Sequence, residues 1–185
     1  MKRLLFHISG RKGSGKTTLL EWFSNDGYFT TEVRFHLEKA IARGEFNPKD
    51  IPDPFWWTEQ MVNLCYQDLK EKSLVFITGL YHHNELDYFI RRGYGVHNIG
   101  ISVKTSKRHE RILRRIKEKE GHLTAEDLHQ KDRKREGRIL GYKEKADVES
   151  LIRDSEILLS NDGTLQDFKG EYLRLKKFLA ETYKV

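Results

Sequence analysis

The sequence predicts a single α/β domain in which a five-stranded parallel sheet is covered by helices on both faces. Short β-rich runs alternate with helical patterns along the chain, which is the order that parallel strands and their crossover helices produce. The first β-rich run leads directly into a glycine-rich turn and a helix. At 185 residues the chain is long enough for one such domain and too short for two ordinary ones.

The expected elements follow from apolar periodicity and turn signals. Strands are expected at residues 3–8, 28–31, 73–78, 96–103 and 157–159. Helices are expected at residues 16–24, 33–43, 56–70, 84–92, 106–118, 124–138, 143–153 and about 164–183. Residues 45–55 hold all three prolines and are therefore predicted to be a loop. Thr164 follows an Asn-Asp-Gly turn and can cap the last helix.

Composition excludes several classes of protein. Hydrophobic residues make up 37% and charged residues 34%, which is typical of a globular chain rather than a disordered one. No apolar run approaches the roughly 20 residues that a membrane-spanning helix needs. The single cysteine, Cys65, cannot form an internal disulfide, and no CxxC pair offers a zinc site. We therefore expect a cytoplasmic protein that does not associate with membranes.

The charge is positive and unevenly distributed. A net charge of +6 fits an anionic ligand, although charge alone does not separate a nucleotide from a nucleic acid. Basic residues dominate from Lys104 to Arg138. Such a run is either a solvated helix face or a lid that closes over phosphates.

A phosphate-binding motif follows the first strand. Residues 10–17 match the pattern G-x-x-x-x-G-K-[ST] at every fixed position. Glycines let successive backbone N–H groups converge on phosphate oxygens, where a Cβ would obstruct the turn or the ligand. The alternative is a Gly/Ser-rich surface loop, but the match lies between an apolar strand and a helix, as phosphate binding requires. The sequence therefore predicts a phosphate site here.

Two side chains of this motif have distinct expected tasks. Lys16 supplies positive charge to the β- and γ-phosphates, and Thr17 supplies a hydroxyl ligand for Mg²⁺. The predicted ATP-binding residues of the segment are Gly10, Arg11, Lys12, Gly13, Ser14, Gly15, Lys16, Thr17 and Thr18. No N-K-x-D motif for reading guanine is present, which argues against a GTPase.

The phosphate loop, the arginine-rich helices and a late N-D-G-T turn together resemble the nucleoside monophosphate kinase superfamily. This superfamily includes dephospho-coenzyme A kinases and small adenylate-kinase-like proteins of archaea. The resemblance spans nearly the whole chain and implies a three-layer P-loop NTPase fold with a helical lid. It also implies ATP and Mg²⁺ as co-substrate and cofactor, and a small phosphorylated acceptor as the partner.

The resemblance also implies roles for residues outside the phosphate loop. Glu32 and Arg34 take the places of the acid and arginine that open the acceptor-binding helix. In the R-I-x-x-R segment, Arg111 would lie against the adenine and Arg115 would reach the ATP phosphates. The remaining implied residues are Arg133 and Arg135 on the far side of the lid, and Asn161 and Gly163 in the turn that lines the adenine. The implied catalytic set is Lys16, Arg115, Arg133 and Arg135.

The chain departs from the family pattern after the third strand. Thr78 stands where many members have an aspartate that holds Mg²⁺ through water. The segment T-G-L-Y-H-H lacks the arginine that usually follows the glycine and offers His82 or His83 as the acceptor-binding residue instead. Either another carboxylate, such as Glu32, assists the metal, or the chain is a slow or divergent kinase.

Three functions remain open. The leading prediction is an ATP- and Mg²⁺-dependent kinase of a nucleoside or deoxynucleoside monophosphate. The alternatives are a kinase of dephospho-coenzyme A or another small metabolite, and a nucleotide-dependent nucleic-acid-binding or regulatory protein without phosphotransfer. Nucleic acid is not the expected partner. Within the single domain, residues 1–185, we expect a core (1–31, 73–105, 154–185), an acceptor-binding region (about 32–72) and a lid (about 106–140).

Overall fold

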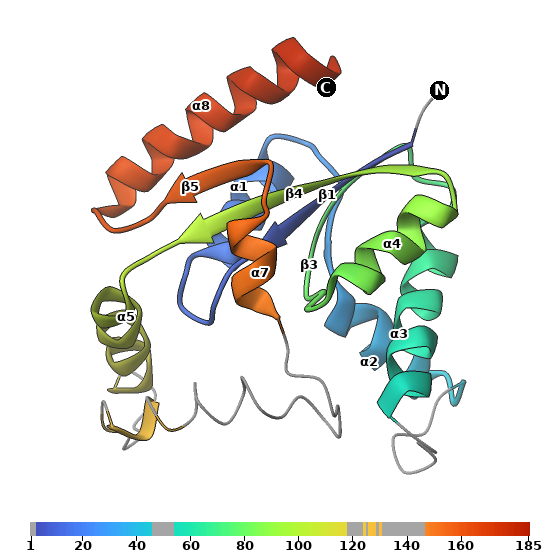
Figure 1. Ribbon diagram of the computed structural model, residues 1–185, viewed down its shortest axis with the longest axis horizontal. Helices are drawn as coiled ribbons and strands as arrows, with labels where there is room; N and C mark the ends of the chain where they lie inside the picture. The colour runs from blue at the N-terminus through green and yellow to red at the C-terminus, as the bar shows by residue number, and fades with distance from the viewer. Residues whose placement is uncertain (1–2, 46–53, 118–123, 125, 129, 131–146) are drawn as a thin grey trace.

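Five parallel strands form the centre of the fold, in the spatial order β2-β3-β1-β4-β5 (Figure 1). This computed structural model describes residues 3–45, 54–117, 124, 126–128, 130 and 147–185. The strands are β1 (Arg3–Ser9), β2 (Thr30–Glu32), β3 (Leu74–Thr78), β4 (Tyr94–Ser102) and β5 (Ile157–Ser160). The helices are α1 (Lys16–Asn25), α2 (Val33–Ala42), α3 (Pro54–Leu69), α4 (His83–Arg91), α5 (Thr105–Lys117), α7 (Val148–Arg153) and α8 (Leu165–Tyr183). The predicted five-stranded parallel sheet is confirmed.

Helices cover the two faces of the sheet with two separate apolar cores. On one face, α1 and α8 pack over aromatic side chains, and the Phe23 and Phe76 rings stack with centroids 3.8 Å apart. On the other face, α3, α4 and α7 contribute Cys65, Phe89 and Leu151, which are all fully buried. Burial of each such large apolar side chain stabilises the fold by about 1.5–3 kcal/mol. Burial also raises the pKa of the Cys65 thiol, so Cys65 is a packed core residue.

Two strands begin two residues away from the predicted position, one because of a local hydrogen bond and the other because of pairing with β1. The second strand was expected at residues 28–31 but begins at Thr30, because the Tyr28 N–H donates to Phe23 O and is not available to the sheet. The fourth strand was expected to begin at residue 96 but begins at Tyr94, which pairs with Arg3 at the start of β1. Gly95 is therefore a strand residue despite its low intrinsic preference for strands.

Two helix boundaries also correct the prediction. Pro54 was expected in a loop but begins α3, where its missing N–H would have no intrahelical acceptor in any case. A helix was expected from residue 143, but Asp147 caps α7, and its carboxylate accepts from the Ser150 N–H at 3.0 Å. Residues 143–146 lie outside the described residues, as does most of the helix expected at 124–138. The capping role of Thr164 is confirmed, because its hydroxyl accepts from the Asp167 N–H.

The parallel arrangement collects the candidate functional segments at one edge of the sheet. All five strands end at this edge, so the turns after β2, β3, β1, β4 and β5 follow one another along it. The segments that begin at Glu32, Thr78, Gly10 and Asn161 therefore share this edge although they are far apart in the chain, and the segment at Gly10 lies near its middle. Among the described helices, none is long and apolar enough to cross a bilayer.

Candidate functional site

The loop between β1 and α1 has the backbone shape that its glycines allow. Gly13 and Gly15 have φ angles of 83° and 105°, in the left-handed region that residues with a Cβ rarely adopt. Gly15 is the N-cap of α1, and its carbonyl accepts from the Leu19 N–H at 3.0 Å. The helix therefore begins at the loop and directs its N–H groups and the positive end of its dipole toward it.

Neighbouring segments enclose this loop closely. A Cβ added to Gly13 would lie 3.0 Å from Ile112 Cγ1 of α5. A Cβ added to Gly15 would lie 2.5 Å from Asn161 Nδ2, in the turn after β5. The loop is thus packed between α5 on one side and the turn after β5 on the other, and neither approach leaves room for a larger residue.

The lysine and threonine of the motif lie at the start of α1. The Lys16 ammonium donates to Gly10 O at 2.5 Å and to Arg11 O at 3.2 Å, which places it over the loop. Thr17 lies in the first turn of the helix and is exposed at the same edge of the sheet. One cation and one hydroxyl therefore flank the converging N–H groups of the loop.

Arg111 of α5 reaches the turn after β5. Its Nη2 atom donates to Asn161 O at 2.9 Å, to Asn161 Oδ1 at 3.2 Å and to Gly163 O at 3.2 Å. Asn161 is 6% exposed, and its Nδ2 atom donates to Ser14 O of the phosphate loop at 2.7 Å. The structure therefore brings together Arg111, Asn161 and Gly163, three residues that the resemblance assigned to one part of the site, and connects them to the phosphate loop.

Arg108 is a contact residue of this site that the sequence analysis did not single out. It is 1% exposed, and its Nη1 atom donates to Lys12 O at 2.9 Å. Arg108 and Ile112 are four residues apart, so they project from the same face of α5 onto the loop. That spacing was readable in the sequence, but which face of the charged helix would be buried was not.

Glu32 and Thr78 lie side by side at the ends of β2 and β3. Side chains alternate along a strand, and Phe76, two residues before Thr78, belongs to the core beneath α1. Glu32 and Thr78 therefore share the sheet face that carries α1 and Thr17. Within the described residues the Glu32 side chain does not cap α2, although Glu32 is the N-cap residue. The Thr78 hydroxyl donates to Ile8 O at 3.0 Å and is buried.

The other predicted site residues have different environments. The Arg34 side chain is 78% exposed and forms an ion pair of 2.5 Å with Glu38 on the same helix. Arg115 is exposed on α5. Arg133 and Arg135 lie outside the described residues. The structure thus does not direct Arg34 toward the phosphate loop.

His82 lies at the turn between β3 and α4, as the N-cap of that helix, and is buried. Glu85, in the first turn of α4, accepts hydrogen bonds from the N–H groups of Tyr81 and His82. Burial raises the pKa of Glu85 to about 7, although these two hydrogen bonds act to lower it. The turn is therefore held in one conformation by a buried carboxyl group.

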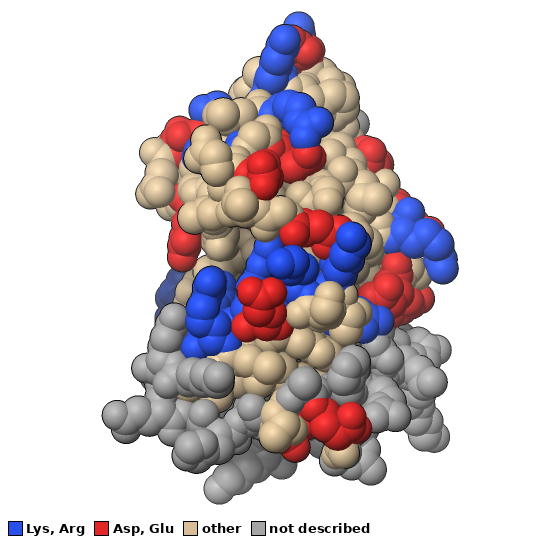
Figure 2. All heavy atoms as spheres, turned by 90° about the vertical axis from the view of Figure 1, so that its left-hand side faces the viewer, with Lys and Arg blue, Asp and Glu red and all other residues tan. Residues whose placement is uncertain are grey.

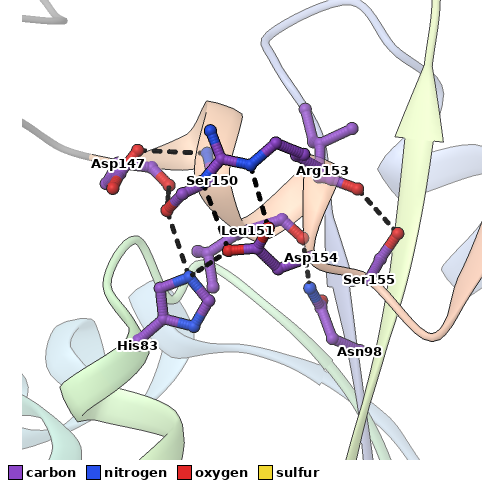
Figure 3. A network of polar contacts seen from close by, with 9 residues as sticks. His83, Asn98, Asp147, Ser150, Leu151, Arg153, Asp154 and Ser155 are labelled. Carbon is purple, nitrogen blue, oxygen red and sulfur yellow. Dashed lines mark hydrogen bonds and ion pairs between the residues drawn. The ribbon is translucent and has the colours of Figure 1, made fainter.

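Helix α7 is connected to this turn and to the phosphate loop by contacts that the sequence analysis did not predict. His83 Nε2 lies 3.1 Å from Ser150 Oγ and 3.5 Å from Asp154 Oδ2 (Figure 3). The Asp147 N–H donates to Tyr81 O at 3.1 Å. Glu149 forms an ion pair with Arg11. The segment that follows the predicted lid is therefore anchored on the β3–α4 turn and on the loop.

His7 lies beneath this edge of the sheet, in β1. Its Nδ1 atom is 3.0 Å from Asn98 Oδ1, and Asn98 Nδ2 donates to Leu151 O at 2.5 Å. Complete burial lowers the pKa of His7 to about 4, and the nearby charge of Lys16 contributes to the same shift. His7 is therefore a neutral, structural imidazole at neutral pH. In the described part of the chain no three His, Cys, Asp or Glu side chains are grouped as metal ligands, so His7 does not belong to such a group there.

Comparisons with known proteins relate the chain to solved kinase structures. No family model matches the chain, and no curated protein does. A shikimate kinase from Bacteroides thetaiotaomicron superposes with a TM-score of 0.62 at 16% identity, over 95% of this chain and 98% of that one. TT1252 from Thermus thermophilus gives 0.61 at 18%, over 98% and 99%. A gluconokinase from Sinorhizobium meliloti 1021 gives 0.56 at 14%, over 99% and 95%. The chain therefore has the same three-layer α/β fold as these solved structures, two of which are named as kinases.

Proposed function

We propose that this protein is an ATP- and Mg²⁺-dependent phosphotransferase that acts on a small acceptor molecule. The observation that carries the proposal is the phosphate loop, with Gly13 and Gly15 in left-handed conformations and Lys16 over the loop, at the N-terminus of α1. The kinase folds that the chain resembles support it. Transfer between two anionic molecules requires positive charge, alignment and exclusion of water more than it requires a reactive side chain.

In this proposal ATP lies over the phosphate loop and extends toward the turn after β5. The loop N–H groups and the Lys16 ammonium hold its phosphates. The adenine lies beside Arg111 and the turn containing Asn161 and Gly163. Arg111 Nη1 is buried and makes no hydrogen bond to any residue that the structure describes, so the turn does not use all the donors of this guanidinium. Asn161 fixes the spacing between the base and the phosphates, because it bonds to Ser14 O.

The residues at the sheet edge fit a hard cation such as Mg²⁺, which prefers oxygen ligands. Thr17 would contribute its hydroxyl, and Glu32 its carboxylate from the same face of the sheet. Glu32 would thereby replace the aspartate that many family members carry at the position of Thr78, whose own hydroxyl is bonded to Ile8 O. Mg²⁺ bound there neutralises charge on the transferring phosphoryl group.

The acceptor belongs on the other side of the loop, near Glu32 and the β3–α4 turn with His82. A nucleoside monophosphate is the acceptor that the sequence resemblance implies, and dephospho-coenzyme A is a variant of it. The Arg34–Glu38 ion pair favours a second candidate, an acceptor hydroxyl without a phosphate, because the Arg34 guanidinium is exposed and already paired with a carboxylate. The names of the kinase neighbours also favour an acceptor hydroxyl without a phosphate, since shikimate and gluconate are hydroxy acids.

The division into regions is part of the proposal. Residues 1–31, 73–105 and 154–185 would form the nucleotide-binding core, and residues about 32–72 would hold the acceptor. The segment of about 106–140 would close as a lid, with Arg115, Arg133 and Arg135 bringing positive charge to the phosphates. Closure of this kind excludes water and thereby limits hydrolysis of ATP.

An acceptor screen tests the proposed reaction. ADP formation is followed with ATP and Mg²⁺ in the presence of nucleoside monophosphates, dephospho-coenzyme A, and small hydroxy acids and polyols. We expect one class to raise the rate at least about tenfold above ATP hydrolysis alone, because a correctly positioned acceptor reacts faster than a water molecule that is not held in place. If no acceptor raises the rate above that of hydrolysis, the phosphotransfer proposal is wrong.

Nucleotide-dependent binding of nucleic acid is the competing function. Figure 2 shows that Lys and Arg side chains gather in a band across the face that it displays, but that acidic side chains interrupt this band. A steep fall in polynucleotide affinity with added salt would support nucleic-acid binding. A weak and flat titration would exclude it.

Replacement of Arg111 with Ala tests the adenine side of the site. The guanidinium bonds to Asn161 and Gly163, so its loss should loosen the turn and raise the KM for ATP about tenfold, as expected for a charge-assisted contact. Arg114→Ala is the matched control, because Arg114 is exposed on the same helix. Equal KM values for the two variants would contradict the assignment.

A further inference from the structure

His36 of α2 connects the end of β2 to α3. Its Nε2 atom lies 2.8 Å from Thr31 Oγ1, and its Nδ1 atom lies 2.9 Å from Asp68 Oδ2. Lys39 also donates to Asp68 Oδ2, at 3.0 Å. Thr31 and His36 are each 8% exposed, so both partners of the shorter contact are removed from water. Strand β2, helix α2 and helix α3 therefore meet at one imidazole.

The charge of Asp68 determines which atom donates in its hydrogen bond with His36. Burial acts to raise the pKa of Asp68, but the hydrogen bonds from His36 and Lys39 outweigh it and leave that pKa below its usual value. Asp68 is thus an ionised acceptor, and His36 Nδ1–H donates to it. The Thr31 hydroxyl can either donate to Nε2 or accept from it, so the 2.8 Å contact is a hydrogen bond in both cases. One imidazole therefore joins the Thr31 hydroxyl to the Asp68 carboxylate.

A hydroxyl, an imidazole and a carboxylate in this order also occur in hydrolases. Here the Thr31 hydroxyl is buried. Thr31 pairs with Ile77 of β3, and its side chain projects toward α2, where it contacts His36. A nucleophile must be accessible to its substrate. The arrangement therefore serves to hold the backbone rather than to attack a substrate.

The strand that this network holds carries Glu32. Strand β2 is only three residues long and is an outer strand of the sheet, and among the described strands it pairs with β3 alone. Thr31 and Glu32 project to opposite faces because side chains alternate along a strand. A fixed Thr31 therefore determines the direction of the next side chain. Val33, the residue after Glu32, also packs closely on Gly79 after β3. A Cβ added to Gly79 would lie 3.2 Å from Val33 Cβ.

We propose that His36 is a positioning residue: held between Thr31 and Asp68, it fixes the end of β2 so that the Glu32 carboxylate is placed to bind Mg²⁺ together with ATP. This inference rests on the proposed function, because it assigns Glu32 to the metal. His36 acts only through the strand and contacts neither ATP nor the metal. The role resembles that of residues behind a metal ligand, whose loss weakens metal binding without removing any ligand.

Binding of ATP at a series of Mg²⁺ concentrations, measured by calorimetry without any acceptor, tests this inference. The main variant is Thr31→Val, which removes the hydroxyl and keeps a β-branched side chain. We expect the Mg²⁺ concentration for half-maximal enhancement of ATP binding to rise about tenfold, the lower end of the range for residues behind a ligand. Thr30→Val makes the same change one residue earlier on β2 and should leave this concentration unchanged.

A double-mutant cycle separates positioning from general destabilisation. Glu32→Gln should raise the Mg²⁺ concentration for half-maximal enhancement of ATP binding, here called the Mg²⁺ requirement, by at least about tenfold. Adding Thr31→Val to Glu32→Gln should then change it by less than about twofold, because Thr31 acts through the carboxylate that is already lost. His36→Asn is the second variant: it keeps a donor toward Asp68, loses the contact with Thr31, and should reproduce the Thr31→Val shift if that protein folds poorly.

Several results would overturn the inference. Equal shifts from Thr31→Val in the wild-type and Glu32→Gln backgrounds would show that the network acts independently of Glu32. A Thr31→Val protein that behaves like Thr30→Val, or an unchanged Mg²⁺ requirement in Glu32→Gln, would also overturn it. Failure of the wild-type protein to bind ATP would overturn both this inference and the proposed function. Mg²⁺-dependent ATP binding without turnover of any acceptor would contradict only the proposed phosphotransfer, and the cycle would still decide the role of His36.

Discussion

Lys16→Ala should lower acceptor-dependent ADP formation about 100- to 1,000-fold, the range for removal of one preorganised group that stabilises transition-state charge. The Lys16 ammonium lies over the phosphate loop, within hydrogen-bond distance of Gly10 O and Arg11 O. The loop N–H groups remain in the variant, but the mobile positive charge near the transferring phosphoryl group is gone. Steady-state kinetics with the acceptor identified in the screen measures the change.

Lys107→Ala is the control for this prediction. Lys107 lies on α5 near the loop but is half-exposed and pairs with Glu110 at 3.5 Å. Its replacement removes the same charge from the molecule without changing the loop, so the rate should stay within about twofold of wild type. A Lys16→Ala protein with nearly wild-type kcat/KM would remove the foundation of the proposed active site.

Gly15→Ala should destabilise the protein and weaken ATP binding at the same time. Gly15 has a φ angle of 105°, and an added Cβ would lie 2.5 Å from Asn161 Nδ2. The backbone strain alone costs about 1–3 kcal/mol. For a chain of this size, that corresponds to a fall in Tm of roughly 2–12 °C. The overlap adds to this by pushing Asn161 away from Ser14 O. Thermal unfolding and ATP titration measure the two effects.

Gly170→Ala makes the same substitution where the structure predicts the opposite sign. Gly170 lies within α8, and nothing outside its own helix lies within 4 Å of the position of an added Cβ. Alanine is favoured over glycine in a helix interior by about 0.5–1 kcal/mol, so this variant should be slightly more stable than wild type. If both alanine variants changed Tm in the same direction, the close approach at Gly15 would be contradicted.

Features that depend on a few adjacent residues were predictable from the sequence. The glycine-rich turn between β1 and α1 was predicted because glycines, Lys16 and Thr17 have a fixed local spacing between a strand and a helix. The capping of α8 by Thr164 follows from the same kind of local chemistry. The Pro54 and Tyr28 boundaries were predicted wrongly. A proline is permitted in the first turn of a helix, and the Tyr28 N–H is satisfied by Phe23 O rather than by the sheet.

Contacts between distant segments could not be predicted in the same way. Asn161 and Ser14 are 147 positions apart, and only the order of the strands brings the turn after β5 to the phosphate loop. The sequence showed that Arg108 is basic, but its burial depends on how α5 packs on Gly13. Nor did the sequence reveal that Arg34 would pair with Glu38, since both an inward and an outward orientation fit its position on α2.

The sequence by itself determined the glycine-rich loop between a strand and a helix, the parallel α/β class and most helices, because backbone preference, periodicity and turn chemistry are local properties. The tertiary structure decided which side chains surround that loop. The sequence already offered Glu32 as a carboxylate that assists the metal, but its place beside Thr78 depends on the register in which β2 pairs with β3. His36 gained a role because α2 and α3 pack so that Asp68 faces it. Register and packing are set by burial summed over the whole chain, and no short segment contains that information.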